Sequence, residues 1–263
     1  FGGWADLLGV ELPADRTTYR SFGGAGVIVD QVHGTACAEI VHDVAPGAEL
    51  LLAHIRTQND FYAALDWLAG ENVHTVTMSL GWYGIGPGDG TGEMNDEIAA
   101  FVSAADAVFL TSAGNERLSH WQGTGLDDDG NDWVDFEPGD DLNSLTLSMA
   151  EGDRVSVHLV WNDWGSPTSD YSLHLFNLDG PEPVQVRFSD RQQSGASWQS
   201  PHENLSYTAV DGGRFGVRIG RAGVVGTHDL ELFSLDSDLE IRVAEGSVTI
   251  PSDSPDAIAV AAI

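Results

Sequence analysis

The hydrophobic pattern of this chain changes its period twice, and this change limits the possible folds more than any other feature. Up to about residue 116, apolar runs of strand length alternate with segments in which apolar residues recur at helical spacing. From 117 to 247 the helical spacing disappears, and short alternating segments separated by Gly- and Asp-rich turns replace it. A continuous apolar run returns at 258–263. The sequence therefore predicts an α/β domain that is interrupted by an all-β insertion.

The two parts of the pattern predict different architectures. Residues 1–116 and 248–263 are expected to form one α/β domain, because strand–helix–strand alternation with short connections produces a parallel sheet covered by helices. One of its helices is expected to begin at a cap provided by Asn59 or Asp60. Residues 117–247 are expected to form a β-sandwich of the jelly-roll kind. Such a compact domain is tolerated as an insertion where it enters at a loop.

Composition narrows the range of partners. The formal net charge is −30, and all 11 basic residues are arginines. This charge argues against nucleic acid as a partner, because binding to phosphates requires a basic surface. No apolar run approaches the ~20 residues of a membrane-spanning helix, so no membrane span is expected. The single cysteine, Cys37, cannot form an intrachain disulfide, and its place on the apolar stripe of 33–44 predicts a buried side chain rather than a reactive thiol.

Two short polar motifs lie at the ends of predicted elements. His33-Gly34-Thr35 opens the predicted helix 33–44, and Ser112-Ala113-Gly114-Asn115 follows the apolar strand 107–110. A side chain at the carboxyl end of a strand lies where open α/β sheets bind ligands. An imidazole can act as a general base in acyl transfer, and an amide can stabilise the oxyanion that develops. The alternatives are a histidine without a role at a helix N-terminus and an asparagine in a left-handed turn after Gly114.

Five segments carry a resemblance to a known family: His33-Gly34-Thr35, Val44-Ala45-Pro46-Gly47-Ala48, Met78-Ser79-Leu80-Gly81, Ser112-Ala113-Gly114-Asn115 and residues 251–262. Together they resemble the subtilisin-like serine peptidases, over the α/β part of the chain but not over the insertion. The resemblance implies a secreted serine endopeptidase that acts on polypeptides, with His33 as general base and Asn115 as oxyanion donor. It also implies that Ser79, Leu80 and Gly81 line the pockets for the residues that precede the scissile bond.

Two motifs of that family are not found in the chain. The family's aspartate lies in an Asp-Thr/Ser-Gly context at the end of an early strand, and no aspartate before His33 fits this context. The Gly-Thr-Ser motif of the nucleophile would follow Ile263. We therefore expect this chain to be a fragment that does not hydrolyse peptides by itself.

An acidic run at 127–135 is a candidate calcium site. Asp127, Asp129 and Asn131 match the first three side-chain ligands of an EF-hand loop. Asp132 stands where that loop requires glycine, and its twelfth position is a proline, so the run is not an EF-hand. A calcium site of another shape, formed by Asp127, Asp129, Asn131 and Asp132, and a solvated acidic loop both stay open. No organic cofactor is expected.

A function of another class is also compatible with the sequence. The insertion could be a module that binds polysaccharide, protein or calcium, with the α/β part as a pseudo-peptidase. Asp163 and Asp170 form a second pair of carboxylates before an alternating strand, and they are a further candidate for metal. Aromatic side chains provide flat surfaces for sugars, but they also fill the cores of sandwiches. The tryptophans in question are Trp121, Trp133, Trp161, Trp164 and Trp198.

Overall fold

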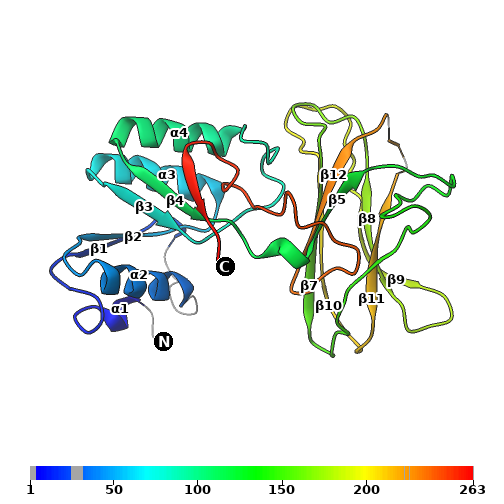
Figure 1. The fold of residues 1–263 in the computed structure, drawn as a ribbon, viewed down its shortest axis with the longest axis horizontal. Coiled ribbons are helices and arrows are strands. Elements are labelled where there is room, and N and C mark those ends of the chain that lie inside the picture. Colours follow the sequence, from blue (N-terminus) through cyan, green and yellow to red (C-terminus); the bar gives the residue numbers. More distant parts are fainter. Residues whose placement is uncertain (1–3, 25–31, 222, 225, 263) are drawn as a thin grey trace. The chain divides into compact units, whose positions relative to one another are not determined.

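The computed structural model of the chain describes residues 4–24, 32–221, 223–224 and 226–262 (Figure 1). The chain divides into two compact units. The first unit consists of Phe1–Leu80, Glu93–Ser112 and Ser254–Val260, and the second of Gly81–Gly92, Ala113–Asp253 and Ala261–Ile263. The segment 81–92 therefore groups with the second unit, which the hydrophobic pattern did not indicate. The limits of the insertion predicted from the sequence, 117 and 247, stay a prediction.

The first unit contains the longer helices and the parallel strands. The strands form two small parallel sheets, one of order β1-β2 and one of order β13-β4-β3. The elements of this unit are α1 (Trp4–Leu7), β1 (Thr17–Ser21), α2 (His33–Val44), β2 (Leu50–His54), α3 (Gln58–Gly70), β3 (Thr75–Met78), α4 (Glu93–Ala105), β4 (Val108–Ser112) and β13 (Ala257–Val260).

Helix α3 shows how local sequence determines an element of the first unit. Its N-cap is Thr57, which accepts a hydrogen bond from the backbone N–H of Asp60, while the Asp60 carboxylate accepts one from the backbone N–H of Thr57. This reciprocal capping box satisfies backbone donors that the helix itself leaves unpaired. The predicted cap at Asn59 or Asp60 was wrong, because Asp60 occupies the third helical position. The apolar face of α3 is buried, and its Phe61 lies edge-on to Phe109 of β4, with ring centroids 6.2 Å apart.

The prediction of a subtilisin-like parallel sheet covered by helices was wrong. The described strands include more antiparallel than parallel ones, and the parallel strands do not join into one sheet. One face of β13-β4-β3 is also not covered within the described residues, since Val108 is 45% exposed and both Ile258 and Val260 are 54% exposed. Strand–helix alternation determines that neighbouring strands run parallel, but it does not determine how many strands share a sheet or what covers each face.

The second unit is a pair of antiparallel four-stranded sheets, of orders β10-β7-β12-β5 and β6-β11-β8-β9. Its core consists of inward-facing residues from both sheets, and Leu159, Leu175 and Val217 are among the fully buried ones. Burying such a side chain contributes about 1.5–3 kcal/mol. The elements are η1 (Glu116–Leu118), β5 (His120–Thr124), β6 (Asn143–Ser144), β7 (Arg154–Trp161), β8 (Ser172–Asn177), β9 (Val184–Ser189), β10 (His202–Thr208), β11 (Phe215–Gly220) and β12 (Asp229–Leu235).

Candidate functional site

His33 lies at the carboxyl end of a parallel strand in the first unit. It is the first residue of α2, its side chain is exposed, and its Nε2 is 2.9 Å from the backbone oxygen of Ser79, which directly follows β3. A carbonyl oxygen accepts but cannot donate, so Nε2 carries the proton in this contact. The structure therefore brings together two of the predicted site residues, which are 46 positions apart in the chain.

The tautomer of His33 has a chemical consequence. A triad imidazole accepts the proton of the nucleophile at Nε2 and donates from Nδ1 to a carboxylate. With Nε2 donating to Ser79, a neutral imidazole has its free lone pair on Nδ1 instead. His33 can act as the base through Nε2 only after it releases the Ser79 carbonyl. Cys37, one turn further along α2, lies with its Sγ 3.9 Å from Nε2 and is half-buried rather than buried as predicted.

A shallow hollow of about 220 Å³ lies at the same edge of the first unit. It is formed where β3, β4 and β13 end, and parallel strands place their carboxyl ends together at the edge where α/β sheets bind ligands. Ser79 lines this hollow and contacts His33, so the hollow lies beside the His33 imidazole. The residues around the hollow are Thr77, Met78, Ser79, Leu110, Thr111, Ser112 and Val260.

Asn115 belongs to the second unit, and its side chain is exposed. Its φ angle is −119°, so the alternative of an asparagine in a left-handed turn was wrong; the left-handed position is Gly114, with φ of 97°. The Asn115 side-chain amide makes no hydrogen bond within the described part of the chain, and its N–H donors therefore stay available to a ligand. An amide held in this way has the chemistry of an oxyanion donor.

The peptide of Asn115 is held by a buried carboxylate that the sequence did not indicate. Glu116 is 8% exposed, and its Oε2 accepts a hydrogen bond of 2.5 Å from the backbone N–H of Asn115. Its other oxygen, Oε1, accepts a hydrogen bond of 2.5 Å from the hydroxyl of Tyr83. Burial, and then the hydrogen bond and charge of Glu116, raise the pKa of Tyr83 well above its usual value, so that the phenol remains a donor.

Three segments of the second unit meet beside Asn115. A Cβ added at Gly81 would come closer than 3.0 Å to Thr249. A Cβ added at Gly114 would come closer than 3.0 Å to the Glu116 carboxylate, so both positions favour glycine. The backbone of Trp82 pairs with that of Ile250, with N–O distances of 2.8 and 3.3 Å. The structure therefore places Gly81, one of the predicted substrate-binding residues, in the same cluster of loops as Gly114 and Asn115.

A pair of histidines, His158 and His202, lies beside Tyr83. Nδ1 of His158 is 3.1 Å from Nε2 of His202, and the rings are stacked with an angle of 7° between their planes. Burial lowers the pKa of His158 to about 4 and that of His202 to about 3, the latter with a further contribution from His158 itself. The ring of Tyr83 lies 5.0 Å from that of His158, so the hydroxyl that binds Glu116 extends from a ring packed on the pair.

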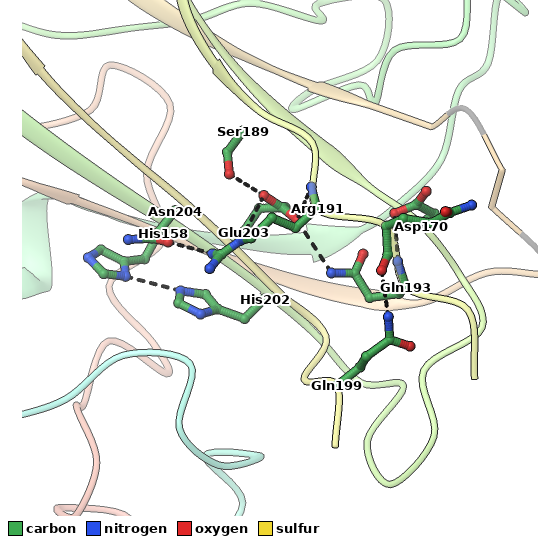
Figure 2. A network of polar contacts seen from close by, with 10 residues as sticks. His158, Asp170, Ser189, Arg191, Gln193, Gln199, His202, Glu203 and Asn204 are labelled. Atoms are coloured by element: carbon green, nitrogen blue, oxygen red, sulfur yellow. Dashed lines mark hydrogen bonds and ion pairs between the residues drawn. The ribbon is translucent and has the colours of Figure 1, made fainter. Parts of the chain in front are cut away.

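Figure 2 shows a second buried carboxylate, that of Glu203, which follows His202 on β10. Glu203 is fully buried and accepts hydrogen bonds from the hydroxyl of Ser189, the backbone N–H of Arg191 and the side-chain amide of Gln193. Burial raises the pKa of Glu203, although these donors oppose the shift. Its partners belong to β9 and to the connection that follows it, so Glu203 fixes the start of that connection.

The predicted calcium residues form a loop that closes on its own backbone. The carboxylate of Asp127 accepts hydrogen bonds from the backbone N–H groups of Gly130, Asn131 and Asp132, at 2.7, 3.1 and 3.0 Å. Asp129 accepts from both the backbone and the side chain of Asn131. Backbone and side-chain N–H groups therefore bind several of the carboxylate oxygens of this loop. Calcium stays an untested prediction.

The second carboxylate pair is arranged in the same way. Asp163 accepts from the backbone N–H groups of Thr168 and Ser169 at 2.6 and 2.9 Å, and Asp170 accepts from that of Gln193 at 3.2 Å. Within the described residues, no group of three or more His, Cys, Asp or Glu side chains is placed to hold a metal ion. Asp163 therefore caps its own loop, whereas Asp170 connects two segments that are 23 positions apart in the chain.

The five candidate tryptophans range from buried to exposed, and Trp133 and Trp164 are half-buried. Trp121 and Trp161 are buried in the sandwich core, as the alternative to sugar binding required. Trp133 lies under the guanidinium of Arg218, 5.6 Å from its ring centroid. Trp198 is 84% exposed, on the connection between β9 and β10. Trp198 is thus the tryptophan of this group best placed to contact a partner.

Comparison with known proteins gives a fold but no family. No protein-family model matches the chain, and no curated protein matches it. The Clostridium perfringens CspB protease is similar in structure, with a TM-score of 0.54, 13% sequence identity and coverage of 82% of this chain and 50% of that chain. The chain thus spans half the length of that protease. At this identity the likeness concerns the fold alone, and it shows that most of the chain has a protease-like fold.

Two further solved structures are similar over smaller parts. The surface-associated copper-binding protein CorA of Methylomicrobium album BG8 has a TM-score of 0.29 and 8% identity, over 47% of this chain and 96% of that chain. The CBM22-1–GH10 modules of Clostridium thermocellum xylanase 10B have a TM-score of 0.25 and 13% identity, over 32% and 17%. Neither likeness is strong enough to carry an argument. Separately, the described residues contain no helix of the length and apolarity needed to cross a membrane.

Proposed function

We propose that the protein to which this chain belongs is a secreted serine endopeptidase of the subtilisin-like family, with His33 as general base and Asn115 as oxyanion donor. The observation that carries this proposal is the contact between His33 and Ser79, because it joins two motifs of the family resemblance at one sheet edge. The protease-like fold supports the same class of reaction. The nucleophilic serine and the orienting aspartate are not assigned to residues of this chain.

In the proposed reaction, a serine hydroxyl attacks the scissile carbonyl carbon and His33 takes the serine proton at Nε2. The carbonyl oxygen becomes an oxyanion, to which the Asn115 amide donates a hydrogen bond. Collapse of the tetrahedral intermediate transfers the proton from His33 to the leaving amine, and water then releases the acyl group. A donor of this kind is worth about 2.7–4 kcal/mol in kcat, a figure that was measured in a subtilisin itself.

The substrate is proposed to be an extended polypeptide that pairs beside β3. The strand lies at the edge of its three-stranded sheet, and an edge strand can bind a peptide through backbone hydrogen bonds. Ser79, Leu80 and Gly81 continue from it, and the side chain of Leu80 is exposed. In the free chain His33 donates a hydrogen bond to the Ser79 carbonyl. A substrate that pairs with this carbonyl therefore displaces His33 and frees its Nε2.

A second candidate is a binding module, and Trp198 favours it. The Gln199 side chain accepts hydrogen bonds from the backbone N–H groups of Ser194 and Ala196, and it donates one to the backbone oxygen of Gln192. The loop that carries Trp198 is thus held from within while the ring stays exposed. An exposed aromatic ring on a loop that is held in this way is suited to stacking on a sugar or a side chain.

The peptidase proposal is tested in the full-length protein with a fluorogenic peptide and with a fluorophosphonate, which labels activated serines. His33→Ala should abolish both turnover and labelling, because the serine then lacks its base. His74→Ala, at an exposed histidine before β3, is the matched control and should retain both. Unchanged turnover in His33→Ala would refute the proposal. Binding of oligosaccharide that is lost in Trp198→Ala, in a protein without turnover, would favour the second candidate.

A further inference from the structure

We propose that Glu116 is a positioning residue, which fixes the peptide of Asn115 so that the side-chain amide is presented to the oxyanion. This inference rests on the proposed function, because it assigns a task to a group that the proposed reaction uses. Glu116 itself touches neither substrate nor the reacting atoms; it acts through Asn115.

Both oxygens of the Glu116 carboxylate are hydrogen-bonded. Each oxygen of Glu116 accepts one short hydrogen bond, from the backbone N–H of Asn115 and from the hydroxyl of Tyr83. Hydrogen bonds to a carboxylate are stronger than neutral ones, and those of a buried carboxylate are less exposed to competition by water. Because the backbone N–H of Asn115 is used in this way, its side chain is the part that stays available to a ligand.

The residue before Asn115 leaves room for this contact. Gly114 has φ of 97°, and a Cβ at this position would overlap with Oε2 of Glu116. The glycine therefore allows the Glu116 side chain to fold back over the preceding peptide. Any other residue at 114 would push the carboxylate away from the N–H of Asn115.

Tyr83, the other partner of Glu116, is held by its packing. Its ring lies 5.1 Å from that of Phe233 on β12 and 5.0 Å from that of His158 on β7, so two strands of one sheet hold it. The hydroxyl of Tyr83 is thereby held in place by the sandwich, and Glu116 connects it to Asn115. The chain of contacts thus runs from the sheet to the proposed oxyanion donor without a gap within the second unit.

The test uses Glu116→Gln, Tyr83→Phe and, as a matched control, Glu151→Gln at an exposed glutamate in a turn before β7. The first readout is hydrogen exchange of the backbone N–H of Asn115 in this chain, measured by NMR. It should become at least about tenfold faster in Glu116→Gln, as expected for the loss of a hydrogen bond to a charged group, and should not change in Glu151→Gln. Tyr83→Phe should show a smaller acceleration of the same amide.

The second readout is the steady-state kinetics of the full-length protein. Glu116→Gln should lower kcat by about tenfold and leave KM within about twofold, because the donor acts in the transition state. If Glu116 had only a structural role, Glu116→Gln would lower the melting temperature but would not lower kcat selectively over KM. If exchange of the backbone N–H of Asn115 is unchanged in Glu116→Gln, the inference is overturned, whatever values kcat and KM take.

The two proposals fail in different ways. Faster exchange at Asn115 in a full-length protein without peptidase activity would support the contact and overturn the proposed function. If Glu116→Gln does not fold, Tyr83→Phe decides the matter, since it removes one hydroxyl and keeps the ring. If the backbone N–H of Asn115 exchanges at the same rate in Tyr83→Phe as in the unmodified chain, the inference is overturned.

Discussion

The two residues of the proposed mechanism are held in very different ways. His33, in the first unit, is exposed and makes a hydrogen bond to the Ser79 carbonyl that it must release before it can act as the base through Nε2. Asn115, in the second unit, follows a left-handed glycine, and its peptide is bound to a buried carboxylate. The backbone of the proposed oxyanion donor is therefore held in place, whereas the proposed base makes a contact that it has to release. The Glu116 carboxylate that binds this peptide is in turn held by Tyr83, which packs on the sandwich.

The packing of the two units differs in the same sense. Strand β7 has eight residues, and most of them are buried in the sandwich. Strand β13 has four, and two of its apolar side chains are more than half exposed. We infer that the second unit is the more stable one and the first the more adaptable.

The first prediction contrasts a buried and an exposed apolar residue. Leu159→Ala in β7 should lower the free energy of unfolding of the second unit by about 2–5 kcal/mol, because it leaves a cavity in a fully packed core. Ile258→Ala in β13 should change stability by no more than about 0.5 kcal/mol. Urea titrations followed by tryptophan fluorescence and circular dichroism measure both. A similar loss in the two variants would contradict the proposed difference between the units.

The second prediction is that the folded chain loses stability as the pH falls. The folded state keeps His158 and His202 neutral, with pKa values of about 4 and 3, whereas in the unfolded chain they protonate near 6.5. The unfolded state thus binds more protons in this interval, so stability is fully present above pH 6.5 and is lost as the pH falls towards 4. Each histidine contributes at most about 1.4 kcal/mol per pH unit there.

Thermal unfolding between pH 7 and pH 4 measures this loss. His202→Gln removes one proton acceptor and retains a polar partner for His158, so the dependence on pH should become less steep. His74→Ala, at an exposed histidine of the first unit, should leave the dependence unchanged. An equally steep loss in His202→Gln would show that the pair is not its source.

The third prediction has the opposite sign. Burial, and then the charge of Asp253, raise the pKa of Glu231 on β12 to about 7. Its contribution to stability is present below pH 4.5 and is lost as the pH rises towards 7. Glu231→Gln should therefore be more stable than the unmodified chain at pH 8, by roughly 1–2 kcal/mol, and similar to it at pH 4. A variant that is less stable at pH 8 would mean that the carboxylate makes contacts that favour its charged form.

These polar contacts show why the site could be predicted only in part. His33, Ser79 and Asn115 belong to short motifs whose residues are adjacent in sequence, so the motifs can be recognised without a structure. Glu116 depends on Tyr83, 33 positions earlier, and His158 depends on His202, 44 positions later. No local pattern connects such residues, because their partners are determined by the packing of the sheets.

The same distinction applies to the fold. Hydrophobic period predicted where helices and strands lie, and β7 alternates in the sequence much as expected for a sandwich strand. The arrangement of the parallel strands was wrong, because pairing between strands depends on contacts across more than one crossover. The cap of α3 was placed too late for a local reason: Asp60 was taken for the cap itself, although it is the third residue of a capping box.

That capping box gives the smallest expected effect, and it lies in the first unit. Thr57→Ala removes the side-chain acceptor for the N–H of Asp60 and should lower the stability of this unit by about 1 kcal/mol. Thr57→Ser keeps the hydroxyl and should restore most of the loss. Because the described parallel sheets are small and one face is exposed, a loss of this size should appear as faster hydrogen exchange throughout α3, while exchange in β7 stays unchanged. Equal acceleration in α3 and β7 would show that the two units unfold together, and the difference in their adaptability would then not exist.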